Sequence, residues 1–127
     1  AFTVGCGADA ELKGVTSCIP VKCPAAVAVD NSQIQGNKES SYGLSVAYLC
    51  DMGYTTTGIA CASATFSVSC LAIGQLSAAG SCVAVKCGAP PNVAQADILK
   101  GPKAEPAFPD QLAYGCTQGY TTDGKAD

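Results

Sequence analysis

The sequence contains no histidine and no tryptophan, and each of its seven cationic side chains is a lysine. Without histidine, triads with a histidine base and mixed Cys/His zinc sites are excluded. No Cys-x-x-Cys pair occurs, so an all-cysteine zinc site is not indicated either. The ten carboxylates are scattered, and the neighbours Asp9 and Glu11 are most simply solvated surface. We therefore expect no enzyme activity, no catalytic residue, no metal and no cofactor.

Positive charge is also scarce. The net charge is −3 and the lysines form no basic cluster, so binding to nucleic acid is not expected. No apolar run approaches the roughly 20 residues that a membrane span requires, so insertion into a membrane is not expected.

Large apolar side chains are few as well, since the aromatic residues are only five tyrosines and three phenylalanines. Such a chain cannot build an extensive core and needs covalent cross-links for part of its stability. The nine cysteines can supply them. Disulfides persist in oxidising compartments, so we expect an extracellular protein, either secreted or held at the cell surface.

The cysteines belong to an internal repeat. Three of them recur 64 positions later: Cys6, Cys18 and Cys23 match Cys70, Cys82 and Cys87. A second pair of segments matches at an offset of 66, because residues 48–58 and 114–124 both read Tyr-x-Cys-x-x-Gly-Tyr-Thr-Thr-x-Gly. Repeats of this length indicate an array of similar small units.

The repeated unit resembles the sushi module, also called the complement control protein (CCP) module. The Tyr-x-Cys-x-x-Gly-Tyr stretch is the family's most recognisable segment, and residues 87–92, Cys-Gly-Ala-Pro-Pro-Asn, resemble a module opening. The family usually has Gly-x-Trp-Ser between its last two cysteines, whereas residues 74–77 read Gly-Gln-Leu-Ser. Leu76 in place of tryptophan implies a thinner core and a divergent lineage.

The resemblance implies that the first cysteine pairs with the third and the second with the fourth. Within the chain, this pairs Cys23 with Cys70 and Cys50 with Cys82. Cys87 and Cys116 would pair with Cys6 and Cys18 of a neighbouring copy. Cys61 is left over, and we consider it an intermolecular bond, a free thiol or an inert buried residue.

The fold that we expect is all-β: small, disulfide-rich, sushi-like modules in an elongated tandem array. Residues 45–49 and 64–69 alternate in polarity and predict strands that run into cysteines. Gly53 and Gly119 predict a turn or a bulge. Residues 25–29 follow Pro24 and could begin a helix, but we interpret them as extended chain. Four tyrosines are expected to be buried against the sheets and disulfides: Tyr48, Tyr54, Tyr114 and Tyr120.

The predicted domains are one complete module and two complementary halves. Residues 1–20 form the C-terminal half of a module, residues 21–84 a complete module, and residues 85–127 the N-terminal half of another. Our hypothesis is that the chain is one repeat of a longer array, in which Asp127 precedes Ala1 of the next copy. Copies could be covalently continuous or could complete one another as separate chains.

We predict a non-catalytic structural protein, one unit of a disulfide-linked rod or filament whose partners are neighbouring copies of itself. The alternative is a ligand-binding segment of an adhesion or complement-regulator-like surface protein. Glycans are a further expected feature, because threonines recur in a turn that should be exposed; β-favouring residues at a strand edge are the simpler interpretation. The candidate O-glycosylation sites are Thr55, Thr56, Thr57, Thr121 and Thr122.

Overall fold

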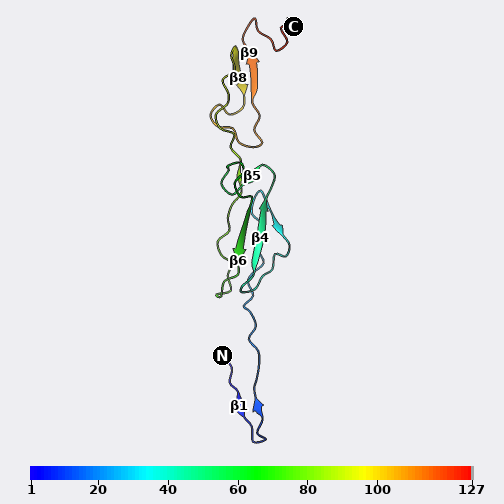
Figure 1. Ribbon diagram of the computed structural model, residues 1–127, viewed down its shortest axis with the longest axis vertical. Coiled ribbons are helices and arrows are strands. Elements are labelled where there is room, and N and C mark those ends of the chain that lie inside the picture. The colour runs from blue at the N-terminus through cyan, green and yellow to red at the C-terminus, as the bar shows by residue number, and fades with distance from the viewer. Residues whose placement is uncertain (127) are drawn as a thin grey trace.

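The computed structural model describes residues 1–126, and all regular structure within them is β-strand (Figure 1). The all-β prediction is therefore confirmed. Asp127, where the expected repeat junction lies, is outside the described residues. The strands are β1 (Gly5–Cys6), β2 (Leu12–Lys13), β3 (Ser32–Gln35), β4 (Ser45–Cys50), β5 (Tyr54–Thr55), β6 (Thr65–Ser69), β7 (Val83–Ala84), β8 (Ala96–Lys100) and β9 (Ala113–Cys116).

The largest sheet is antiparallel, with the order β3-β4-β6. β4 alternates strictly between exposed and buried residues, so Val46, Tyr48 and Cys50 face inward. A period of two with one buried face is typical of an antiparallel sheet that is wet on its other side. β4 and β6 confirm the two strands predicted from the alternation.

The core of this sheet is small. Its buried members are Ala26, Val46, Tyr48 and Val68, and Val29, Ile34, Phe66 and Leu76 pack partly buried around them. Ala26 lies in the predicted extended segment, where its N–H donates to the carbonyl of Lys38 at 2.8 Å. Leu76, which stands where sushi modules usually have tryptophan, packs partly buried against this core.

The chain as a whole buries little surface. It exposes 9317 Å², whereas a compact protein of this mass exposes about 6200 Å². Figure 1 shows why: hairpin β1–β2 lies at one end, the three-stranded sheet in the middle, and hairpin β8–β9 at the other end. We call residues 1–20 the leading segment, 21–84 the central module and 85–126 the trailing segment.

Candidate functional site

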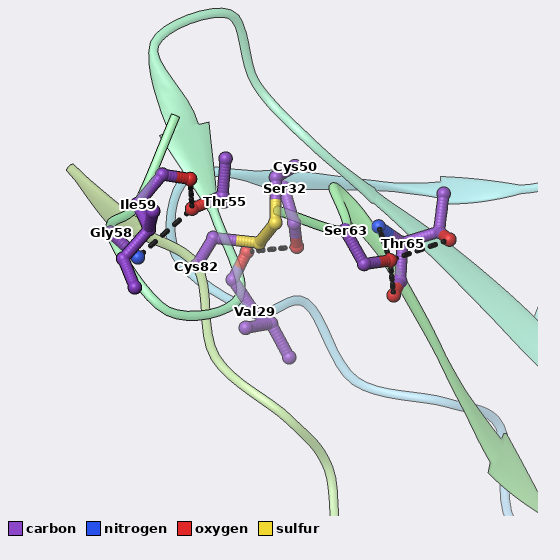
Figure 2. Close-up of a disulfide and its surroundings, with 9 residues drawn as sticks. All are labelled: Val29, Ser32, Cys50, Thr55, Gly58, Ile59, Ser63, Thr65 and Cys82. Atoms are coloured by element: carbon purple, nitrogen blue, oxygen red, sulfur yellow. Dashed lines mark hydrogen bonds between the residues drawn. A yellow bond between two sulfur atoms is a disulfide. The ribbon is translucent and has the colours of Figure 1, made fainter. Parts of the chain in front are cut away.

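Two disulfides hold the central module. Cys23 is bonded to Cys70 and Cys50 to Cys82, which are the pairs that the family resemblance implies. They cross-link opposite ends of the central sheet, since Cys50 ends β4 and Cys70 follows β6. Figure 2 shows the Cys50–Cys82 bond beside Ser32 and Val29, and both cysteines are buried. The covalent links thus fix both ends of a thin sheet.

The remaining cysteines are Cys6, Cys18, Cys61, Cys87 and Cys116, and all five are unpaired and exposed. The inert buried alternative for Cys61 is therefore wrong. Cys61 has a left-handed backbone, with φ of 67°, in the loop between β5 and β6. The other four lie in the leading and trailing segments, and their pairing with another copy stays a prediction.

The threonine turn is only partly exposed. Thr55 is buried, its hydroxyl donates to the carbonyl of Ile59 at 3.1 Å, and it accepts from the N–H of Gly58 at 2.9 Å (Figure 2). The exposure expected for the whole cluster is thus wrong at Thr55, because this hydroxyl stabilises the turn. Thr57, Thr121 and Thr122 are exposed and Thr56 is half-buried, and their glycosylation stays a prediction.

The trailing segment folds like the first half of the central module. The Tyr114 hydroxyl donates to the carbonyl of Pro91 at 2.7 Å, as the Tyr48 hydroxyl does to that of Val27 at 2.7 Å. A second pair of bonds matches: Asp51 N–H to Asn31 O at 2.8 Å, and Thr117 N–H to Gln95 O at 2.9 Å. Asn31 and Gln95 both have left-handed backbones, with φ of 58° and 57°. The sequence repeat is therefore also a repeat of hydrogen bonds.

The leading segment folds like the second half. Gly7 N–H donates to Glu11 O at 2.8 Å, and in the central module Leu71 N–H donates to Gln75 O at 2.9 Å. Cys6 is paired with Leu12 across β1–β2, as Cys70 is bridged to Leu76. The backbone contacts of residues 6–12 thus match those of residues 70–76, and the division of the chain into module halves stays a prediction.

The central module and the trailing segment meet at an ordered junction. Val85 N–H donates backward to Gly53 O at 2.9 Å, and its carbonyl accepts from Phe108 N–H at 2.8 Å. The rings of Tyr54 and Phe108 meet edge to face, with centroids 5.9 Å apart. A Cβ at position 53 would overlap the Phe108 ring, so only glycine permits this approach. The sequence interpretation missed Phe108, although its repeat counterpart Tyr42 is also aromatic.

The tyrosines differ in burial. Tyr48 is buried as predicted, whereas Tyr54 and Tyr114 are half-buried. Tyr120 is 54% exposed, so its predicted burial is wrong within this chain. Tyr120 lies beyond β9, where the described residues contain no counterpart of β7 to cover it.

Lys13 and Asp9 form an exposed ion pair. Lys13 Nζ lies 2.9 Å from Asp9 Oδ2 on the surface, and Asp9 also accepts from Glu11 N–H. The hydrogen bond from Lys13 and that from the backbone hold the pKa of Asp9 below its ordinary value. Among residues 1–126 no group of three or more His, Cys, Asp or Glu side chains is placed to hold a metal ion, and no helix there has the length and apolarity to cross a membrane.

Comparisons with known proteins agree with this architecture. The chain is 32% identical over 108 residues to the rat (Rattus norvegicus) Sushi, von Willebrand factor type A, EGF and pentraxin domain-containing protein 1. The match covers 84% of this chain and 3% of the relative. It is 33% identical over 106 residues to the mouse (Mus musculus) protein of the same name, with 83% and 3% covered. It is 24% identical over 111 residues to the complement decay-accelerating factor of Pongo pygmaeus. This match covers 87% of the chain and 32% of that relative. No family model matches the chain.

The chain spans a small part of these relatives. Together with the two disulfides and the all-strand fold, the similarities support a sushi-like module in residues 1–126. The first two relatives are named for their sushi domains and the third as a complement factor, and none of these names is that of an enzyme.

Proposed function

We propose that this chain is a non-catalytic, architectural segment of an extracellular protein, in which sushi-like modules follow one another as a stiff rod. The observation that carries the proposal is the junction at Val85. This one residue is hydrogen-bonded to Gly53 behind it and to Phe108 ahead of it. A linker that is hydrogen-bonded on both sides fixes the orientation of one module relative to the next. A spacer or a fibre needs this fixed orientation.

The neighbouring contacts add to the stiffness. Lys86 N–H donates to Gly58 O, and Cys87 N–H donates to Pro106 O, both at 2.9 Å. Thus three consecutive linker residues are tied to turns on either side. The extracellular location rests on the two disulfides and on the sushi-domain names of the relatives.

Residual dipolar couplings test the stiffness of the junction. They are measured on the folded chain in dilute solution, where it is monomeric. We expect couplings of β4, β6, β8 and β9 to fit one alignment tensor. In Phe108→Ala, the couplings of β8 and β9 should shrink while those of β4 and β6 stay. Met52→Ala is the matched control, because Met52 is 89% exposed beside Gly53. Independent tensors in the native chain would contradict an architectural role.

A second candidate function is recognition of a ligand, as a segment of an adhesion or complement-regulator-like protein. It is favoured by the complement protein among the relatives and by a pocket of about 460 Å³ beside the junction, whose lining includes Val85, Phe108 and Pro109. The two functions differ in a simple observable. A recognition segment is a monodisperse rod that binds a partner, whereas a structural repeat assembles with its own copies.

A further inference from the structure

We propose that the central module binds a small carboxylate ligand in a pocket beside Lys22 and Ser41. The ligand carries a hydrogen-bond donor next to its carboxylate, as an α-hydroxy acid or an α-amino acid does. The pocket has a volume of about 350 Å³, and its lining includes Lys22, Glu39, Ser40, Ser41 and Leu44. This site goes beyond the proposed architectural function and does not depend on it.

The trailing segment repeats the backbone of this pocket with different side chains, so it provides a comparison within the chain. Leu44 N–H donates to Ser41 O at 2.9 Å, and Asp110 N–H donates to Ala107 O at 2.7 Å. In both places the first residue of the turn is also joined to a lysine by an isolated antiparallel bridge. Ser41 and Leu44 therefore correspond to Ala107 and Asp110.

In the trailing segment a carboxylate is bonded to this turn. Asp110 Oδ2 accepts from the N–H of Ala107 at 3.0 Å. The central module has Leu44 at the position of Asp110, and leucine has no acceptor. Among residues 1–126 the Ser41 N–H makes no hydrogen bond. The central module thus presents a backbone donor that binds a carboxylate in the equivalent turn, without a carboxylate of its own.

A second, independent observation is the buried hydroxyl of Ser40. Ser40 is 9% exposed, and its Oγ has no hydrogen-bond partner among the described residues. Buried hydroxyls are normally bonded, because an unsatisfied one costs free energy. Rotation of this side chain toward the pocket gives up no hydrogen bond, and a ligand carboxylate would supply the missing acceptor. The trailing segment has Pro106 at this position and therefore lacks the hydroxyl.

The charged groups at the pocket define which carboxylate fits. In the trailing segment, Lys86 Nζ lies 3.8 Å from Glu105 Oε2. Their counterparts Lys22 and Glu39 both line the pocket, yet no ion pair joins them in the part of the chain that the structure describes. The Lys22 ammonium can therefore bond an external carboxylate, while Glu39 requires a donor beside it. An α-hydroxy or α-amino acid provides both groups.

A preceding module does not cover this surface. Lys86 and Glu105 follow the central module directly, and their side chains are still 57% and 52% exposed. The equivalent lysine and glutamate of the central module are exposed as well. The second half of that module leaves the pocket open too, although Cys23 in the lining is already bonded to Cys70. The pocket is therefore a property of the complete module.

The test is an NMR titration of the whole chain at constant pH and ionic strength, in which the Ser41 amide is followed. The probes are glycolate, glycine, acetate and chloride. We expect saturable downfield shifts with glycolate and glycine, and an affinity about threefold or more above that for acetate, because acetate offers Glu39 no donor. Shifts that rise linearly with every probe, chloride included, would overturn the proposal.

Leu44→Asp supplies from within the chain the carboxylate that Asp110 supplies in the trailing segment. Without ligand, it should move the Ser41 amide in the direction in which glycolate moves it. It should also lower the affinity for glycolate about tenfold or more, because its carboxylate occupies the donor and repels the ligand. Leu44→Met is the matched control and should bind like the parent. If Leu44→Asp changed neither the shift nor the affinity, the Ser41 N–H would not be the carboxylate site.

Ser40→Ala tests the buried hydroxyl. It should keep the fold, because this hydroxyl makes no hydrogen bond, and should weaken glycolate binding about threefold or more. Lys22→Gln should weaken it by a similar factor. Ser41→Ala is the matched control, since it keeps the backbone N–H and should bind like the parent. Parent-like affinity in both Ser40→Ala and Lys22→Gln would overturn the proposal, while the remaining amide shifts report whether each variant is folded.

Discussion

The rings of Tyr48 and Phe66 lie stacked, with centroids 4.7 Å apart and planes inclined by 8°. Tyr48 comes from β4 and Phe66 from β6, and they face one another across the register of that pair. Tyr48 is the largest fully buried side chain among the described residues, and Phe66 packs partly buried against the core to which Tyr48 belongs. The backbone at Gly80 lies against the Phe66 ring, so close that a Cβ on residue 80 would stand 2.9 Å from the ring.

Phe66→Ala should destabilise the central module by about 2 kcal/mol, less than the roughly 3–5 kcal/mol of a fully buried phenylalanine, because Phe66 is half-buried. Urea denaturation of the non-reduced chain measures this. Phe2→Ala is the matched control, since Phe2 holds the equivalent sequence position but is 50% exposed in a single chain. Equal losses in the two variants would contradict the packing described here.

Tyr48→Phe should cost about 1 kcal/mol, because it leaves the carbonyl of Val27 without its 2.7 Å hydrogen bond while the ring stays in place. Tyr42→Phe provides the comparison, as that side chain is 58% exposed. Chemical denaturation curves with unchanged slope would report both. If removing the Tyr48 hydroxyl were neutral, the shared tyrosine bond would not be a stabilising feature of the repeat.

The sequence predicted those features that depend on period and repetition. The alternation in residues 45–49 and 64–69 marked the central strands because each residue's face follows from its position. The matched spacing also predicted that the segment around Tyr114 would copy that around Tyr48. The disulfide pairs came from the family resemblance, since spacing alone leaves several pairings open.

What the sequence could not show depends on contacts between distant residues. Thr55 and Thr57 belong to one run of threonines, yet only Thr55 folds inward, because the turn bends back over its hydroxyl. Phe108 could not be recognised as a junction residue either, because its role depends on its contact with Gly53, which is 55 positions earlier in the sequence. Strands β5 and β7 have two residues each, too few for any period to be recognised.

Thr55→Val should lower the stability of the central module by about 1–3 kcal/mol, because Gly58 N–H then loses its acceptor in a buried turn. The isosteric change keeps the volume, so the loss is that of the hydrogen bonds. Thr57→Val, at an exposed position of the same run, should change stability by less than about 0.5 kcal/mol. A tolerated Thr55→Val would mean that the buried hydroxyl is not what holds the turn.

The Asp9 carboxyl should titrate below the usual range of aspartates, because Lys13 and the backbone N–H of Glu11 bond to its charged form. A folded pKa below the unfolded one contributes stability that is present above the unfolded pKa and is lost as pH falls through the folded pKa. Carboxyl carbon NMR should show the midpoint rising in Lys13→Gln. Because both groups are exposed, salt should also raise it. An unchanged midpoint in Lys13→Gln would assign the effect to the backbone alone.

The two disulfides should contribute similar amounts to stability, although they lie at opposite ends of the sheet. Their sequence separations are 47 for Cys23–Cys70 and 32 for Cys50–Cys82, and the chain-entropy relation gives about 4.0 and about 3.7 kcal/mol for loops of these lengths. Replacing either pair by alanines should therefore lower the unfolding free energy by a comparable amount, measured by denaturant titration. Cys61→Ala is the control, because this thiol is exposed and unpaired. If only one replacement lowered the unfolding free energy, the other disulfide would close a loop that the thin core already holds in place. The cross-link would then stabilise the module at one end only.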